Sequence, residues 1–290
     1  MKISVSSYSF SKMKISQLEA ISRAHEIGLR AIEFTDLVPP EGVTQEEYAL
    51  QIRAEAERLG MTINSYTVSG DFLNGSDGDL EAEIEKIKKK VDIAALLGVT
   101  VMRHDATRGY APEVREYRGF DQALPTLAKG YRAVTEYAAT KGIRTCVENH
   151  GYFCQDSDRV EKLINTVAHP NFGWLVDMGN FLCVDENPVT AVSRAASYAV
   201  HAHAKDFFVR SGSGVNPGRG FFVTRGGNYI RGSIIGQGDV PVYQCIRILK
   251  KAGYDGYLSI EFEGVEDPMY GIAVGFENLQ RLIALAEENP

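Results

Sequence analysis

Short apolar or β-branched runs alternate with longer segments of helical spacing along the whole chain, and this alternation restricts the possible folds more than any other feature. Runs of period two indicate strands, and apolar residues three and four positions apart indicate amphipathic helices. The pattern predicts strands at 3–10, 30–36, 62–68, 99–105, 145–151, 172–178, 199–207 and 257–264. It predicts helices at 15–28, 45–59, 80–97, 124–140, 159–167, 189–198, 242–251 and 272–287.

Glycines mark several of the expected helix ends. The segments EIGLRA, RLGMTI, LLGVTV, TKGIRT and KAGYDGY each place a glycine between a helix and the next strand, where a left-handed cap is needed. Strands that alternate with helices pair in parallel through right-handed crossovers. Eight such units predict an α/β fold, the (β/α)8 TIM barrel, and an open doubly wound sheet is the structural alternative.

The chain shows no sign of internal division. No composition break, proline-rich linker, low-complexity tract or short repeat is present, so residues 1–290 are expected to form a single TIM-barrel domain. One connection, residues 207–239 after the seventh strand, is unusually long. It is rich in Gly, Ser, Arg and aromatic residues. Connections beyond about 12 to 15 residues are usually functional or disordered. We expect this one to form a lid or a substrate wall.

Four of the predicted strands end in side chains that bind metals: Glu148, Asp177, His203 and Glu261. In a barrel of this kind the active site lies at the carboxyl ends of the strands. Three carboxylates and one imidazole suit a divalent cation such as Mn²⁺, Mg²⁺, Co²⁺ or Zn²⁺. Each residue alone has a structural explanation, such as an arginine pair, an Asx turn or a core histidine. Their recurrence at four successive strands favours one cation site.

Side chains two positions apart share a face of a strand, and this places further polar groups near the same end of the barrel. His150 shares a face with Glu148, and Lys205 shares one with His203. The fourth predicted strand ends in Arg-His-Asp at 103–105, and its register leaves open whether residue 103 or 104 faces the mouth. These groups are candidates for contact with a substrate.

Composition and charge disfavour several classes of partner. The formal charge of −7 and the pI near 5.5 would repel phosphate backbones, so no nucleic acid is expected. The four cysteines form no C-x-x-C pair, which predicts unpaired thiols and a reducing compartment. The first residues do not resemble a secretory signal, and no apolar stretch approaches the roughly 20 residues that span a bilayer. We therefore expect a cytoplasmic protein without a membrane partner, and a homo-oligomer remains possible.

The segments VENHG, VDMGN, HAHAKD, GQGDVPV and GYDGYLSIEFEG resemble those of the xylose isomerase-like barrel superfamily of sugar isomerases and epimerases, which includes D-tagatose 3-epimerase and inosose dehydratase relatives. The resemblance covers nearly the whole chain, but its motifs are not specific to one reaction. It implies a carbohydrate substrate and a single ion, Mn²⁺ or similar, held by Glu148, Asp177, His203 and Glu261. It also implies that Glu148 and Glu261 are the acid/base pair for isomerisation of a keto sugar or 3-keto glycoside through an enediolate.

Three positions depart from the tagatose epimerase branch. Asn180 stands where that branch has a substrate-binding histidine, Val209 stands where it has an arginine, and Gln237 stands where many relatives carry glutamate. Arg210 lies one place after the expected arginine. These departures imply a substrate different from that of the tagatose epimerase branch. Asn180 and Arg210 remain candidate substrate contacts, together with Lys205.

His150 suggests a second mechanism, because imidazole is a better base near neutral pH than a metal-bound carboxylate. With His150 as base, the same site would act as a lyase or dehydratase that eliminates from a 3-keto sugar or inosose, including C-glycoside cleavage. Tyr8 and Phe153 are candidate aromatic contacts for a sugar, and packing in the core or at the rim is the alternative for each. A DNA-repair barrel of the endonuclease IV type and a non-catalytic sugar-binding barrel are less favoured.

Overall fold

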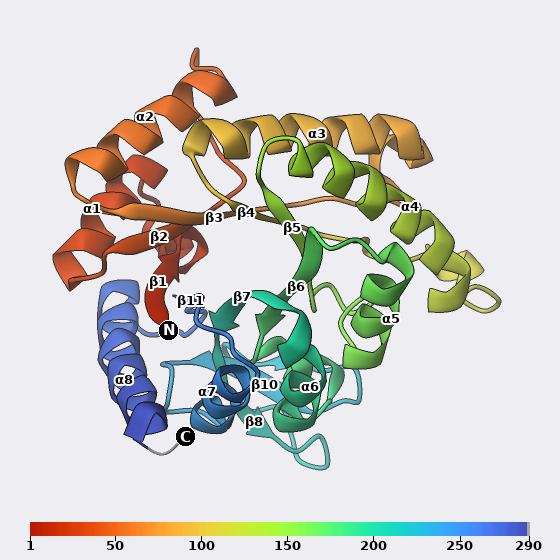
Figure 1. The fold of residues 1–290 in the computed structure, drawn as a ribbon. Coiled ribbons are helices and arrows are strands. Elements are labelled where there is room, and N and C mark those ends of the chain that lie inside the picture. Colours follow the sequence, from red (N-terminus) through yellow and green to blue (C-terminus); the bar gives the residue numbers. More distant parts are fainter. Residues whose placement is uncertain (289–290) are drawn as a thin grey trace.

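The computed structural model describes residues 1–288 and contains a closed barrel of eight parallel strands, which confirms the predicted TIM barrel (Figure 1). The strands are β1 (Lys2–Ser6), β2 (Ala31–Thr35), β3 (Thr62–Val68), β4 (Val101–His104), β5 (Arg144–Glu148), β6 (Phe172–Asp177), β7 (Ala199–Ala204) and β11 (Tyr257–Ile260). Around the barrel they follow the order β1, β11, β7, β6, β5, β4, β3, β2. Parallel pairing of β1 with β11 closes the barrel.

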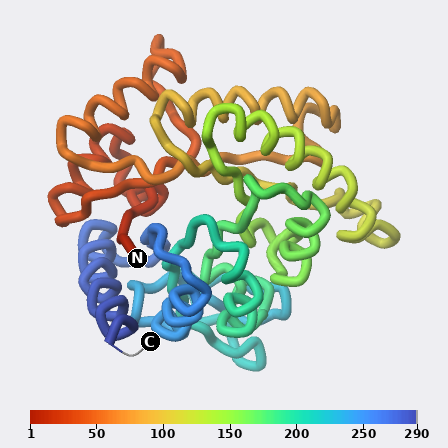
Figure 2. Tube along the Cα trace, viewed as in Figure 1, coloured from red at the N-terminus to blue at the C-terminus, as the bar shows by residue number. Residues whose placement is uncertain are grey.

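Within the described residues, eight α-helices cover the outside of the barrel. They are α1 (Gln17–Ile27), α2 (Gln45–Arg58), α3 (Leu80–Leu97), α4 (Phe120–Ala139), α5 (Ser157–Val167), α6 (Pro188–Ala195), α7 (Val242–Lys251) and α8 (Pro268–Glu288). Figure 2 shows that α8, the last helix, returns to lie beside the first segment of the chain. It contacts α1 and β1, so the ring of helices closes together with the ring of strands.

Local sequence signals start and end the helices. At the start of α2, the Thr44 hydroxyl accepts a hydrogen bond from the Glu47 N–H, and the Glu47 carboxylate accepts one from the Thr44 N–H. This capping box pairs two N–H groups that the helix itself leaves free. Gly28 and Gly98 end α1 and α3 at φ 105° and 78°, a conformation that costs glycine little. All five glycines predicted at helix ends have positive φ.

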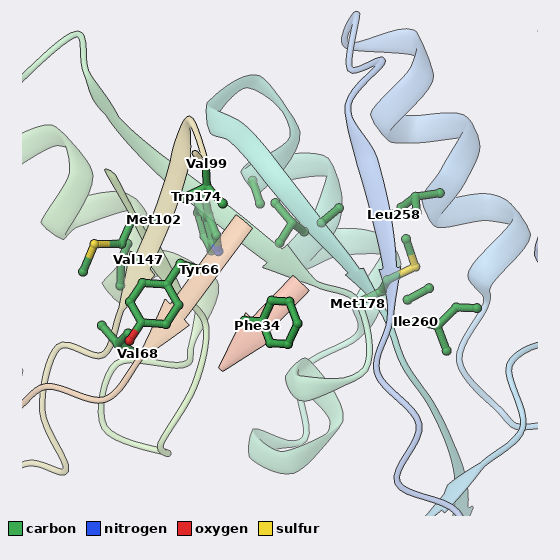
Figure 3. Packing of buried hydrophobic residues seen from close by; sticks show 14 of the residues in the cluster. Phe34, Tyr66, Val68, Val99, Met102, Val147, Trp174, Met178, Leu258 and Ile260 are labelled. Carbon is green, nitrogen blue, oxygen red and sulfur yellow. The ribbon is translucent and has the colours of Figure 1, made fainter. Parts of the chain in front are cut away.

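The barrel strands separate an apolar layer from a polar interior. Tyr66 and Trp174 belong to the buried apolar core, part of which is shown in Figure 3. Burial of each large apolar side chain there contributes about 1.5–3 kcal/mol to the stability of the fold. The Ser259 hydroxyl of β11 lies 2.6 Å from the Ser4 hydroxyl of β1, and the Asn64 amide of β3 donates to it at 3.4 Å. Because β3 and β11 are not neighbours, these polar side chains meet inside the barrel.

The long connection after the seventh barrel strand contains a second sheet. This sheet has the order β8, β10, β9 and is antiparallel, with bounds β8 (Asp206–Arg210), β9 (Phe222–Val223) and β10 (Tyr229–Ser233). The seventh barrel strand ends at Ala204, so the assignment of Asp206 and Phe207 to it was wrong. The chain leaves the barrel there because the Asp206 carboxylate accepts hydrogen bonds from the second sheet and its flanking turn. The donors are the N–H groups of Phe207, Gly236, Gly238 and Val240.

All four cysteines are free and buried, which confirms the expectation of unpaired thiols. Within residues 1–288, no helix combines the length and the apolar character that crossing a bilayer requires.

Candidate metal centre

The four side chains expected to bind a metal lie together at the carboxyl end of the barrel. Glu148 and Asp177 are the last residues of β5 and β6, His203 is the penultimate residue of β7, and Glu261 directly follows β11. One potential ligand atom from each lies within 4.8 Å of all the others. From His203 Nδ1, the distances are 3.7 Å to Glu148 Oε1, 3.6 Å to Asp177 Oδ2 and 3.5 Å to Glu261 Oε2.

Strand register produces this convergence. Asp177 of β6 pairs directly with His203 of β7, and Ile260 of β11 pairs with Ala204. The Glu261 N–H then donates to the Ala204 carbonyl at 3.0 Å, which extends the pairing one residue beyond β11. Residues that are adjacent in sequence point to opposite faces of a strand, so this register sends all the ligand side chains to the same face.

Two buried atoms at the centre of the cluster have no hydrogen-bond partner. Asp177 Oδ1 accepts from the N–H groups of Gly179 at 2.8 Å and Asn180 at 2.9 Å, whereas Asp177 Oδ2 accepts no hydrogen bond. His203 Nδ1 is equally unpaired. Lys205 Nζ lies 3.1 Å from Asp177 Oδ2 and offsets part of its charge, but neither that oxygen nor His203 Nδ1 makes a hydrogen bond within the described residues. A buried polar atom without a hydrogen bond is costly, and a cation between these two atoms would bind both. Three carboxylates and one imidazole therefore fit Mn²⁺ or Mg²⁺ in chemistry as well as in position.

Lys205 lies beside the candidate ligands and balances part of their charge. Its Nζ is 2.5 Å from Glu261 Oε2 and 3.1 Å from Asp177 Oδ2. Burial by itself would lower the pKa of Lys205, but the charges of Asp177 and Glu261 outweigh it and raise that pKa well above its usual value. Burial also raises the pKa of Glu261, but Lys205 and His203 outweigh this effect and hold it well below the usual range.

Glu148 is fixed by two neighbours. Its Oε2 accepts from the Arg103 guanidinium at 2.7 Å, and its Oε1 accepts from the Asn180 side-chain amide at 3.0 Å. Burial raises the pKa of Glu148, but Arg103 and His203 outweigh this effect and lower it. Asn180 also accepts a hydrogen bond from Lys205 Nζ at 3.0 Å. The carboxylate is therefore held both ionised and in one orientation.

The structure settles which side chain of β4 faces the mouth. Arg103 lines the cavity beside Glu148. The ring of His104 instead stacks on Tyr131, with centroids 4.3 Å apart, and meets the edge of Phe72. His104 is fully buried and belongs to the packing between barrel and helices.

A cavity of about 320 Å³ opens over the cluster, and Tyr8 and Lys205 both line it. Tyr8 follows β1 in a 3-10 turn and is 43% exposed. Glu263 also lines the cavity, with its Oε1 3.3 Å from Lys205 Nζ. A larger hollow of about 680 Å³, beside Lys2 and Phe276, lies at the amino ends of the strands, away from these ligands.

His150 lines the same cavity and has a defined orientation. Its Nδ1 lies 2.8 Å from Asp105 Oδ1, and the side chain is 49% exposed. Desolvation lowers the pKa of His150, but the hydrogen bond and the charge of Asp105 outweigh it and raise that pKa. Asp105 is itself 2.5 Å from Arg103, so a chain of contacts links His150 to Glu148. The contact with Asp105 leaves Nε2 as the ring nitrogen available to a substrate.

Phe153 and Arg210, two of the candidate substrate contacts, do not line this cavity. Phe153 packs against the rings of Tyr110 and Phe120 behind the mouth. The side chain of Arg210 is 57% exposed and donates to the carbonyl of Val209 on the second sheet. The structure therefore does not bring these two side chains to the cluster. Asn180 is brought there, behind Glu148 and Lys205.

Sequence reasoning missed Glu33, which lies in the barrel interior beneath His203. Glu33 Oε1 is 3.0 Å from His203 Nε2, and Glu33 Oε2 is 2.6 Å from His201 Nε2. Only one signal could have found it, which is a single glutamate within the otherwise apolar run AIEF. An ionisable side chain inside a buried strand needs partners, and the sequence does not show where they are.

The comparisons with known proteins agree with the fold. The family profile for the xylose isomerase-like TIM barrel matches residues 21–282. Among curated proteins, the chain is similar to inosose dehydratase from Clostridium botulinum (strain Alaska E43 / Type E3), with 28% identity over 156 residues. That alignment covers 53% of this chain and 51% of the relative, so the match spans about half the length of each.

Two solved structures share the fold over nearly their whole length. L-ribulose 3-epimerase superposes with a TM-score of 0.74 at 16% identity, covering 99% of this chain and 96% of that one. A xylose isomerase-like TIM barrel protein from Mycobacterium smegmatis, in complex with magnesium, gives a TM-score of 0.72 at 18% identity, covering 98% and 97%. At such identities the likeness shows a common architecture.

Proposed function

This chain belongs to the xylose isomerase-like TIM barrel family, and on that basis we propose that it is a divalent-metal-dependent carbohydrate isomerase or epimerase. The proposed substrate is a keto sugar or a 3-keto glycoside, and the proposed reaction moves a proton at the carbon next to the carbonyl through an enediolate. The proposed cofactor is one Mn²⁺, with Mg²⁺, Co²⁺ and Zn²⁺ as alternatives. The magnesium complex of the Mycobacterium smegmatis neighbour supports a cation in this fold.

One observation carries the proposal. Asp177 Oδ2 and His203 Nδ1 are buried without hydrogen-bond partners, and they face the carboxylates of Glu148 and Glu261. Buried polar atoms usually make hydrogen bonds in folded proteins, so two that lack one and lie in the same cluster favour a bound cation, with Lys205 as a neighbouring charge. A divalent cation bound there would supply Lewis-acid polarisation of a substrate carbonyl.

We assign the proton transfer to Glu148 and Glu261. They reach the cavity from β5 and from the end of β11, and β6 and β7 lie between those strands. One carboxylate oxygen takes the proton next to the carbonyl, and the other carboxylate returns a proton to that carbon or its neighbour. Arg103 fixes Glu148 and Lys205 fixes Glu261, so neither needs to reorient. General acid–base catalysis of this kind contributes about 10²- to 10⁴-fold in rate.

The charges around the cavity favour a neutral sugar over a phosphorylated one. Besides the proposed ligands, carboxylates of Asp36, Asp105 and Glu263 line the cavity, and they would repel a phosphate group. Lys205 and Tyr8 are the proposed hydrogen-bond partners for sugar hydroxyls.

Incubation of the Mn²⁺-loaded protein with a panel of keto sugars and 3-keto glycosides in D₂O tests the proposal. The expected product is an isomer or epimer that carries deuterium at the carbon next to the carbonyl. A Glu148→Gln variant should still bind the sugar but lose this exchange, because the amide cannot accept the proton. Absence of any deuterium uptake or product across the panel would count against the proposed chemistry.

The second candidate is a lyase or dehydratase, and the orientation of His150 favours it. Asp105 holds His150 Nδ1 and leaves Nε2 toward the cavity, where it could abstract a proton before a β-leaving group departs. The curated relative from Clostridium botulinum is named for a dehydration. The same enolate would form, but water or an aglycone would then be lost.

His150→Gln separates the two reactions. If elimination is the reaction, loss of this base should reduce turnover by about 10²- to 10⁴-fold. If epimerisation by the two glutamates is the reaction, deuterium exchange should persist within about tenfold of the wild type. Release of water or aglycone from a 3-keto substrate, measured beside deuterium retention, identifies the outcome directly.

A further inference from the structure

We propose that Glu33 of β2 is a positioning residue that orients His203 toward the cation. This inference rests on the proposed metal site, because it concerns how one of its ligands is prepared. The imidazole of His203 lies between the single carboxylate of Glu33 and the three carboxylates of the candidate ligands. Its Nδ1 faces the candidate ligands, and its Nε2 lies 3.0 Å and 3.2 Å from the two oxygens of Glu33.

The chemistry of the contact determines which nitrogen carries the proton. A carboxylate only accepts hydrogen bonds, so the His203 nitrogen that faces Glu33 must be the donor. Nε2 is then protonated, so the lone pair that a cation needs can come only from Nδ1. A histidine ligand whose other nitrogen is hydrogen-bonded to a carboxylate has a fixed tautomer and ring orientation, and loss of such a partner typically weakens metal binding about 10- to 100-fold.

Glu33 is in turn held in place on all sides. It is 0% exposed, and its Oε2 accepts from the Ser65 hydroxyl at 2.6 Å and lies 2.6 Å from His201 Nε2. The hydroxyl of Ser259 lies 3.5 Å from the same oxygen. A fully buried carboxylate with several donors is rigid, so it can fix the ring of His203 without reorganisation.

These distances also argue against a second cation between Glu33, His201 and His203. The oxygens of Glu33 already lie at hydrogen-bond distance from both imidazoles and from Ser65, which leaves no unpaired atom on the carboxylate. A cation there would also need His203 to bind metal through both ring nitrogens at once. The atoms that make no hydrogen bond, His203 Nδ1 and Asp177 Oδ2, belong instead to the cluster with Glu148 and Glu261.

Metal titration of Glu33→Gln tests the proposal. The amide keeps the size of the side chain but replaces one acceptor oxygen with a donor NH₂, so at least one of the contacts to Ser65, His201 and His203 loses its acceptor. We expect Mn²⁺ affinity, measured by calorimetry, to fall about 10- to 100-fold at an unchanged stoichiometry of one. Glu83→Gln is the matched control. It alters another buried glutamate, whose carboxylate accepts hydrogen bonds from the Ser76 hydroxyl and the Asp71 N–H. Mn²⁺ affinity should not change in this variant.

Nitrogen-15 NMR of histidine-labelled protein provides a second measurement, which remains decisive if Glu33→Gln does not fold. In the Mg²⁺-loaded wild type, His203 should show a protonated Nε2 whose proton is shifted downfield by the carboxylate. Absence of that signal would overturn the proposal. In the titration, equal Mn²⁺ affinity in the wild type and a folded Glu33→Gln variant would also overturn it. Binding of two Mn²⁺ ions per wild-type chain would do the same. A wild type that binds no Mn²⁺ would instead refute the proposed metal site itself.

Discussion

At the scale of single residues, hydrogen bonding determines what each polar group of the mouth is free to do. Asp177 illustrates this, because one oxygen is used by two backbone N–H groups and the other faces Lys205 and the other candidate ligands. His203 is divided in the same way between Glu33 and the open cluster. Hydrogen bonds to Asp177 and His203 thus fix which atom of each side chain faces the cluster.

Asp177→Asn tests this arrangement. The remaining oxygen can still accept from the N–H groups of Gly179 and Asn180, so the fold should persist. The second oxygen becomes an NH₂ group that cannot bind a cation, and Mn²⁺ affinity should fall by at least about tenfold. Calorimetric titration measures the change. Asp121→Asn, at an exposed carboxylate paired with Lys162, serves as the control and should bind Mn²⁺ like the wild type.

His104 makes a separate prediction about acid stability. Burial lowers the pKa of His104 from 6.5 to about 4. Between these two pH values the unfolded chain binds a proton that the folded protein does not, so stability should fall as the pH drops from about 6.5 to about 4. His104→Phe keeps an aromatic ring against Tyr131 and removes this proton.

Denaturant unfolding of both proteins at pH 7 and pH 5 measures the effect. Between these two pH values the wild type should lose about 1–2 kcal/mol more of unfolding free energy than His104→Phe does. Equal losses in both proteins would show that His104 is not held neutral in the fold.

At the scale of elements, the second sheet is not a freely moving flap. The Asp206 carboxylate holds its base through four backbone N–H groups. At its other end, Asp185 accepts hydrogen bonds from Thr224 and Asn228, and Arg225 pairs with Asp156. These contacts join the sheet to the loops that follow β5 and β6, and residues 207–239 are not among those that line the cavity over the cluster.

Asp206→Asn should loosen the second sheet. An amide offers one acceptor oxygen in place of two, so some of the four N–H groups lose their partner, and we expect a loss of about 1–3 kcal/mol in unfolding free energy. Limited proteolysis should then cut within residues 211–220 faster than in the wild type. Asp255→Asn, at a carboxylate outside the second sheet, is the control. An unchanged cleavage rate would show that the sheet does not depend on this anchor.

At the scale of the whole molecule, the proposed cation joins four strands that are far apart in sequence. A ligand that binds only the folded state stabilises it, by about 2.7 kcal/mol when present at 100 times its Kd. For a chain of this size we therefore expect saturating Mn²⁺ to raise Tm by about 5–10 °C over the protein in EDTA. Calorimetric scans with and without Mn²⁺ measure the shift. The Asp177→Asn variant should show little of it, and an equal shift in that variant would place the cation elsewhere.

The sequence by itself determined the barrel, because strand and helix periods are local and eight alternations leave few topologies. It also determined that Glu148, Asp177, His203 and Glu261 would meet, since the carboxyl ends of parallel strands share one face. It could not show that Glu33 lies under His203, that Arg103 rather than its neighbour faces the cavity, or that Phe153 turns away. Those contacts depend on the exact register of strands around a closed ring. That register shifts between Ile32 and Glu33, and again in β6, at irregularities that no local pattern reveals.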